Sequence, residues 1–170
     1  MYKYRLYDSI KVKNRASILK YEQYQTVTQR MFRKKGVEMV RRIYVEKKEG
    51  FQVEAAGILN DIKNNLHVTG ISAVRVINRY DIEGISDDTY EKSRCTVFAE
   101  PAVDVVCDEE LPEGPVSVFF ATEYLPGQYD QRADSAAQCI KLIDPSAEPT
   151  VRFARVIVLI GQISEKEMNL

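Results

Sequence analysis

The side chains most suited to chemistry lie in one short segment, Glu123 to Cys139, in which polar residues crowd around a Pro-Gly turn. They are Gln128, Tyr129, Asp130, Gln131, Arg132, Asp134 and Ser135. Arginine donates as a planar fork to carboxylates or phosphates, and the acids and amides beside it offer further donors and acceptors. Loops held between a strand and a helix often carry function. We therefore predict an interaction site here, one that docks a neighbouring domain rather than catalysing a reaction.

A second candidate contact lies in Asn78-Arg79-Tyr80-Asp81, which closes a predicted strand. Asn78 and Arg79 are its proposed contact residues, because an exposed amide and a guanidinium at a strand end suit polar recognition. Arg132 fits a surface helix residue as well as a docking residue.

The sequence contains few of the motifs and residue types that catalysis usually requires. Neither G-x-x-x-x-G-K nor G-x-G-x-x-G occurs, so no ATP site is predicted. His67 is the only histidine, and a reactive cysteine needs a partner that lowers its pKa. Cys139 falls among apolar residues of a predicted helix, so we expect a packed thiol there. We assign no catalytic, cofactor-binding or metal-binding residue.

One acidic cluster deserves a separate interpretation. Its members are Asp104, Asp108, Glu109 and Glu110. Carboxylates of this kind can hold magnesium together with phosphate ligands. Pro112 and Gly114 follow at once, however, and a Pro- and Gly-containing acidic stretch is more typical of a solvated loop.

Composition limits the class of protein. At 170 residues, 45% hydrophobic and 29% charged, the chain can bury a core and stay soluble. No apolar run reaches the length of a membrane span, and Met1 to Lys20 lacks the apolar core of a signal peptide. Its three cysteines are widely spaced, which favours reduced thiols. We expect a cytoplasmic protein without a membrane partner.

The elements that would position the polar segment follow from apolar periodicity. Strands are predicted at 40–47, 74–80, 103–107, 116–124 and 151–160, and helices at 53–66 and 86–98. A further helix follows the Pro-Gly turn, with an apolar stripe of Ala133, Ala136, Ala137 and Ile140. The polar segment therefore forms the turn and first helical turn between a strand and a helix.

The two halves of the chain repeat this plan. Glu46 and Gly50 match Glu123 and Gly127 at a constant offset of 77 residues. The sequence predicts an α+β fold of two β-α-β units with a ferredoxin-like architecture. Within each unit the strands are expected to run parallel in a shared sheet, and the helices that join them are expected to pack on one face of that sheet.

The two ends of the chain differ from the repeated units between them. Residues 1–38 carry ten Lys and Arg against three acids, a net charge of +7, whereas residues 39–170 have a net charge of −8. We interpret 1–38 as a disordered basic leader, or as upstream sequence preceding a true start at Met39. The ordered domain is expected at 39–163. Ser164 to Glu167 fits a helix-opening capping box, so 164–170 is predicted to begin a linker helix that is cut short.

From Met39 to Glu167 the chain resembles the N-terminal domain of the large, single-chain, clostridial-type phosphoribosylformylglycinamidine synthase. The resemblance is carried by 40–48, 76–85, 96–104 and, most specifically, 123–139. It implies a PurS-like domain, similar to a paired copy of the small subunit that bridges the two catalytic parts in split versions of the enzyme. That subunit performs no chemistry itself.

The resemblance also implies the reaction of the whole enzyme. It is an ATP-, magnesium- and glutamine-dependent ligase that forms an amidine in de novo purine biosynthesis. No cofactor is expected in this chain, and the implied partners are the synthetase and glutaminase domains, in cis or in trans. The residues alone leave two other functions open. One is a free-standing ferredoxin-like module that binds a small ligand or a protein, and the less favoured one is a nucleic-acid binder using the basic leader.

Overall fold

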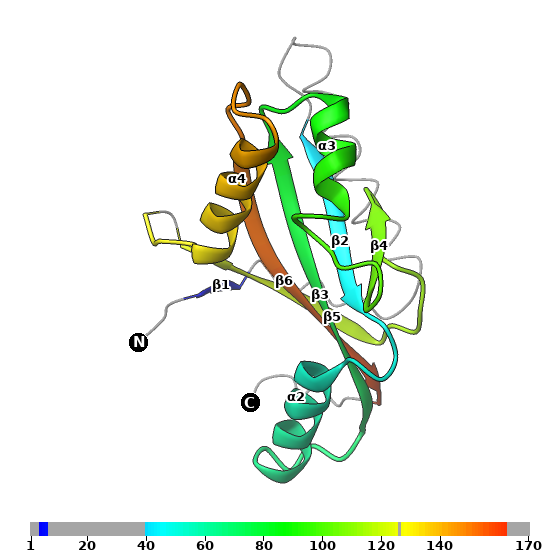
Figure 1. Ribbon diagram of the computed structural model, residues 1–170. Coiled ribbons are helices and arrows are strands. Elements are labelled where there is room, and N and C mark those ends of the chain that lie inside the picture. The colour runs from blue at the N-terminus through cyan, green and yellow to red at the C-terminus, as the bar shows by residue number, and fades with distance from the viewer. Residues whose placement is uncertain (1–3, 7–39, 126, 163–170) are drawn as a thin grey trace.

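The computed structural model describes residues 4–6, 40–125 and 127–162 of the chain (Figure 1). Its elements are β1 (Tyr4–Leu6), β2 (Arg41–Lys47), α2 (Val53–Asn64), β3 (Ile71–Glu83), α3 (Asp87–Arg94), β4 (Asp104–Asp108), β5 (Val118–Tyr124), α4 (Gln131–Ile143) and β6 (Thr150–Gly161). The predicted order of strands and helices from residue 40 onward is confirmed. None of the described helices has the length and apolar character needed to cross a membrane.

The strands form one six-stranded sheet in the order β1-β5-β6-β3-β2-β4. Every neighbouring pair is antiparallel. The α+β class is confirmed, but the expectation of parallel strands within each β-α-β unit is wrong. Instead, β2 and β3 pair as a hairpin with α2 in its connection, and β5 and β6 do the same around α4.

Long-range side-chain pairing explains the antiparallel arrangement. A strand-helix-strand pattern does not fix the direction of the second strand, because α2 can return the chain either way. In the observed register Arg42 lies opposite Asp81, and Ile43 lies opposite Tyr80. Across the β2–β3 pair, a positive side chain therefore lies opposite a negative one, and an apolar side chain lies opposite an aromatic one. The central β3–β6 pair extends from Ile71–Gly161 to Glu83–Thr150 and holds the two hairpins together.

All three described helices pack on the same face of the sheet, here called the helix face. Side chains alternate between faces along a strand, so Val74, Val76, Tyr80 and Ile82 of β3 share one face. Tyr80 and Ile82 belong to the core under α3 and α4, whereas Val74 and Val76 contact α2 in a separate cluster. Figure 1 shows α3 and α4 at one end of the sheet and α2 at the other.

No described helix packs on the opposite face, here called the helix-free face. The connection between β4 and β5 crosses it, because these strands lie far apart in the sheet order. Leu111 and Val116 of this connection pack on a core cluster that includes Ile77 and Val158. Arg75 anchors the crossing, since its Nη2 donates to the Pro112 carbonyl oxygen at 2.9 Å.

The ends of the chain fall mostly outside the described residues. Of the predicted leader, Tyr4–Leu6 form β1, which pairs with Thr122–Tyr124 at the edge of β5. These three residues are the part of the predicted leader that the structure describes. Met39, and the capping box that begins at Ser164, lie outside the described residues. Within the body, α2 ends at Asn64 rather than continuing to Leu66, whose side chain is exposed.

Candidate interaction site

The polar segment forms the turn before α4 and its first turn, as predicted, and one of its residues is an N-cap. The Asp130 Oδ1 atom accepts hydrogen bonds from the backbone N–H groups of Arg132 and Ala133, at 3.1 and 3.0 Å. An aspartate in this position satisfies amides that the helix leaves unpaired and interacts favourably with the helix dipole. Asp130 is therefore needed for folding and is a poor candidate for partner binding.

Tyr129 is the most exposed aromatic side chain near this turn, at 69% of its full exposure. Its hydroxyl donates to Asp134 Oδ2 at 2.8 Å, and the same oxygen accepts from Gln138 Nε2 at 2.7 Å. The hydrogen bond to Asp134 raises the pKa of the Tyr129 phenol. The ring is thus held on the surface of α4 by Asp134, whose carboxylate also bonds Gln138.

Arg132 turns toward the body of the protein rather than away from it. Its guanidinium lies over the Phe153 ring, 5.0 Å from the centroid. Burial raises the pKa of Tyr80, and interaction with Arg132 opposes that shift. Arg132 remains exposed overall, so it covers the aromatic core of the helix face and still presents a charged group at the surface.

The other residues of the segment divide between turn structure and open surface. Gln128 Oε1 accepts from the Leu125 backbone N–H at 3.0 Å, which closes the turn. Gln131 and Ser135 are exposed on α4. The surface around Tyr129 therefore consists of short polar groups with one aromatic ring among them.

The structure separates Asn78 from Arg79. As neighbours on β3 they point to opposite faces of the sheet. Asn78 lies on the helix face, where no hydrogen-bond partner within the described residues reaches its buried Oδ1 atom. Arg79 lies on the helix-free face and is buried, with its Nη2 atom 2.5 Å from Glu123 Oε1. These two residues do not form one contact point with the α4 turn.

Sequence reasoning missed a buried network of charges around Arg79. Asp81 accepts from Arg42 through both carboxylate oxygens, at 2.6 and 2.9 Å, and its Oδ2 lies 3.3 Å from Arg79 Nη2. A second fork joins Arg75 to Glu46 at 2.8 and 2.6 Å. Opposite charges at matching positions of the two strands were the available indication that this face is paired and buried.

Asp108, one member of the predicted acidic cluster, does not lie in an open loop. It is the last residue of β4, and its carboxylate is hydrogen-bonded. Its carboxylate accepts from the Tyr90 hydroxyl at 2.5 Å and from Arg94 Nε at 3.0 Å. Burial would raise the pKa of Asp108, but the hydrogen bonds from Arg94 and Tyr90 outweigh it and lower that pKa. Among the described residues, no three His, Cys, Asp or Glu side chains gather as a metal site would require.

Cys139 is exposed on α4, so the expectation of a packed thiol is wrong.

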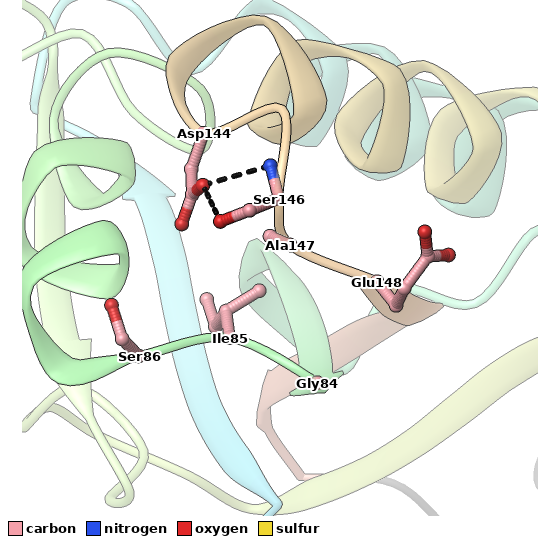
Figure 2. A pocket seen from close by; sticks show the side chains of 7 residues that line it. All are labelled: Gly84, Ile85, Ser86, Asp144, Ser146, Ala147 and Glu148. Atoms are coloured by element: carbon pink, nitrogen blue, oxygen red, sulfur yellow. Dashed lines mark hydrogen bonds between the residues drawn. The ribbon is translucent and has the colours of Figure 1, made fainter.

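An open depression of about 520 Å³ lies between the β3–α3 and α4–β6 connections (Figure 2). Its lining is Gly84, Ile85, Ser86, Asp144, Ser146, Ala147 and Glu148. Figure 2 shows Asp144 turned toward Ser146, whose N–H and hydroxyl both donate to it, at 3.0 and 2.6 Å. Thr89 donates to the other carboxylate oxygen at 2.7 Å. Because these groups already bond to one another, few polar atoms converge on a ligand.

Comparison of this chain with protein-family models, with curated proteins and with solved structures found no significant match. Inferences about its function therefore stand on the residues themselves and on the geometry above.

Proposed function

We propose that this chain is a non-catalytic assembly module that docks to catalytic domains through the exposed surface around Tyr129. The partners that fit the sequence resemblance are the synthetase and glutaminase domains of a phosphoribosylformylglycinamidine synthase. Those domains would use ATP, magnesium and glutamine to form the amidine. In this proposal the chain corresponds to a PurS-like pair of β-α-β units, with its two hairpins as the paired copies.

The observation that carries the proposal is the fixed, exposed ring of Tyr129. Aromatic residues supply much of the binding energy at protein interfaces, and a ring already held in place loses little conformational entropy on binding. The Asp134 side chain, itself bonded to Gln138, holds Tyr129 without burying it. Nothing in the packing of the domain requires an aromatic group at this position, because the ring is largely exposed.

The docking surface excludes two residues predicted from sequence. Asp130 caps α4, and Arg79 is buried in the charge network. We therefore centre the proposed surface on Tyr129, Gln131 and Ser135, with Arg132 at its border. Asn78 is not assigned to it.

The proposal is tested by titrating the chain against the catalytic portion of such a synthase, prepared without its own N-terminal domain. We expect saturable binding, weakened about tenfold or more by Tyr129→Ala, as for a residue that anchors an interface. Leu142→Ala is the matched control, because Leu142 is 84% exposed at the far end of the same helix and lies outside the proposed surface, so this change should alter the affinity little. Thermal melts must show both variants folded.

Two outcomes would contradict the proposal. One is the absence of binding by the unmodified chain at concentrations where its circular dichroism is native. The other is equal affinity of the unmodified chain and Tyr129→Ala, which would place the contact elsewhere. Arg132→Lys tests the border of the surface, because an ammonium does not reproduce a planar fork.

A further inference from the structure

The connection between β4 and β5 crosses the helix-free face with little backbone hydrogen bonding. Residues 111–116, here called the strap, include Pro112 and Pro115, which have no backbone N–H group to donate. The other four N–H groups of the strap make no hydrogen bond to a backbone acceptor among the described residues. The strap is therefore held on the sheet by side chains rather than by strand pairing.

One side chain of the sheet supplies the polar attachment. Arg75 Nη2 donates to the carbonyl oxygens of Pro112 and Glu113, at 2.9 and 3.3 Å. Arg75 lies on β3 near the middle of the sheet and is only 8% exposed. Because a buried donor and acceptor that lose each other have no ready replacement, bonds of this kind are costly to break. Arg75 thus holds the strap by its backbone, whatever side chains the strap carries.

Glu46 keeps the Arg75 guanidinium in the orientation that reaches the strap. Its two carboxylate oxygens accept from Arg75 Nε and Nη2, at 2.8 and 2.6 Å. A planar guanidinium bound through two nitrogens has a fixed orientation, so Nη2 stays directed at the strap. This fork joins β2 to β3 and belongs to the sheet.

The strap backbone is shaped around the guanidinium at Gly114. The φ angle of Gly114 is +155°, which residues with a Cβ atom rarely adopt. A Cβ atom at this position would lie 2.5 Å from Arg75 Nη1. Arg75 cannot move aside without giving up its fork with Glu46. The glycine therefore lets the strap approach the guanidinium closely enough to bond it.

We propose that the strap opens and closes as one unit on the intact sheet, with Arg75 as its latch. Leu111 and Val116 attach the two ends of the strap to the core cluster of the helix-free face, and Arg75 holds the backbone between them. Segments with few hydrogen bonds open at a lower free energy than the whole domain unfolds. Release of Arg75 frees the strap while the strand pairs stay formed. This device is separate from the docking surface around Tyr129.

Cleavage by a glutamate-specific protease measures the opening, because Glu113 is exposed in the strap and cleavage of a folded protein follows the population of its open form. Each rate is divided by that of a peptide with the same strap sequence. Arg75→Lys keeps the charge but loses the fork, so cleavage after Glu113 should be about tenfold faster or more. Arg79→Lys is the matched control, because Arg79 is buried on the same strand and face but bonds Glu123, outside the strap. It should leave this rate nearly unchanged.

A change on the strap side gives a second measurement that leaves the charges of the sheet intact. Gly114→Ala should also speed cleavage after Glu113, because its Cβ atom pushes the strap away from the latch. Gly50→Ala is the control. Gly50 has a positive φ of 87° as well, but a Cβ atom there would meet nothing within 4 Å. All rates are measured at a temperature where circular dichroism shows the variants folded.

Three results would overturn the proposal. One is cleavage after Glu113 that is no faster in folded Gly114→Ala or Arg75→Lys than in the unmodified chain. Another is faster cleavage at sites throughout the sheet, in step with the strap, which would mean that the strap opens only when the domain unfolds. The third is equal acceleration by Arg79→Lys, which would make the effect one of general stability.

Discussion

At the scale of single residues, pairing decides which charges can be buried. Arg42, Arg79 and Asp81 all lie on the helix-free face, and their side chains retain only 10%, 11% and 14% of their exposure. Buried charges are tolerated when each has a partner of opposite sign. Asp81 serves two arginines at once, which makes it the residue on which this network depends.

We expect Asp81→Ala to destabilise the domain by about 3–5 kcal/mol, because it removes the carboxylate that bonds the buried Arg42 guanidinium through both of its oxygens. The matched control is Asp88→Ala, which breaks an exposed pair with Lys92 and should change the stability little. Urea unfolding at neutral pH measures both. Similar losses for the two variants would mean that the helix-free face is effectively solvated.

A second residue-scale effect concerns acid. Because the pKa of Asp108 is lower in the folded protein than its ordinary value of 3.8, its ionised form stabilises the fold. That contribution is complete above the unfolded pKa and is lost as the pH falls through the folded one. Asp108 is 41% exposed, so screening by solvent keeps the effect small.

We therefore predict that Asp108→Asn is less stable than the unmodified chain near neutral pH. The difference should shrink as the pH falls below 3.8 and through the lowered pKa of folded Asp108, because the carboxyl is then protonated in both states. Urea unfolding across this range tests the sign. A difference that stays constant with pH would show that Asp108 acts through shape rather than charge.

At the scale of elements, α4 shows how one helix serves folding on one side and recognition on the other. Ala133, Ala136 and Ile140 are buried against the sheet, whereas Gln131 and Ser135 are exposed. The small alanines let the helix approach the aromatic residues Tyr80 and Phe153, whose ring centroids are 5.2 Å apart. The two faces of α4 can therefore be tested separately.

Ala136→Glu should destabilise the domain by at least about 3 kcal/mol, since it buries a carboxylate without a partner. Ser135→Glu is the adjacent control and should be nearly neutral, because an exposed acid in the first turns of a helix is compatible with its dipole. Thermal melts followed by circular dichroism distinguish them. The reverse order of stability would mean that the helix faces have been assigned backwards.

At the scale of the whole molecule, the described fold from residue 40 onward contains its own core. Among the described residues, the three hydrophobic clusters lie between residues 43 and 160. Of the leader, the structure describes only β1, whose three residues pair at the edge of the sheet. Within the described part of the chain, β1 is thus an edge strand beside β5 and belongs to none of the three clusters.

A chain that begins at Met39 should therefore fold, with a far-ultraviolet circular dichroism spectrum like that of the full chain. Its melting temperature should lie within roughly 5 °C of the full value, because losing a three-residue edge strand costs little. A larger fall would show that the leader contributes more packing than β1 does.

Local patterns in the sequence determined which elements form. Apolar periodicity and turn residues act over a few neighbours, so β2, α3, α4 and β6 were predictable within a few residues. The stripe residues Ala133, Ala136 and Ile140 were placed correctly for the same reason. The α+β class followed from the order of these elements.

Tertiary structure alone decided the direction of the strands and the roles of the polar side chains. Strand direction depends on pairing between residues far apart in sequence, such as Arg42 with Asp81, which no local pattern specifies. Sequence grouped Asn78 with Arg79, but the pleat of β3 sends them to opposite faces. It also treated the residues around Asp130 alike, although one caps a helix and Tyr129 is held on the surface. Burial and partners, not residue type, separate folding roles from binding roles, and both arise only when distant segments meet.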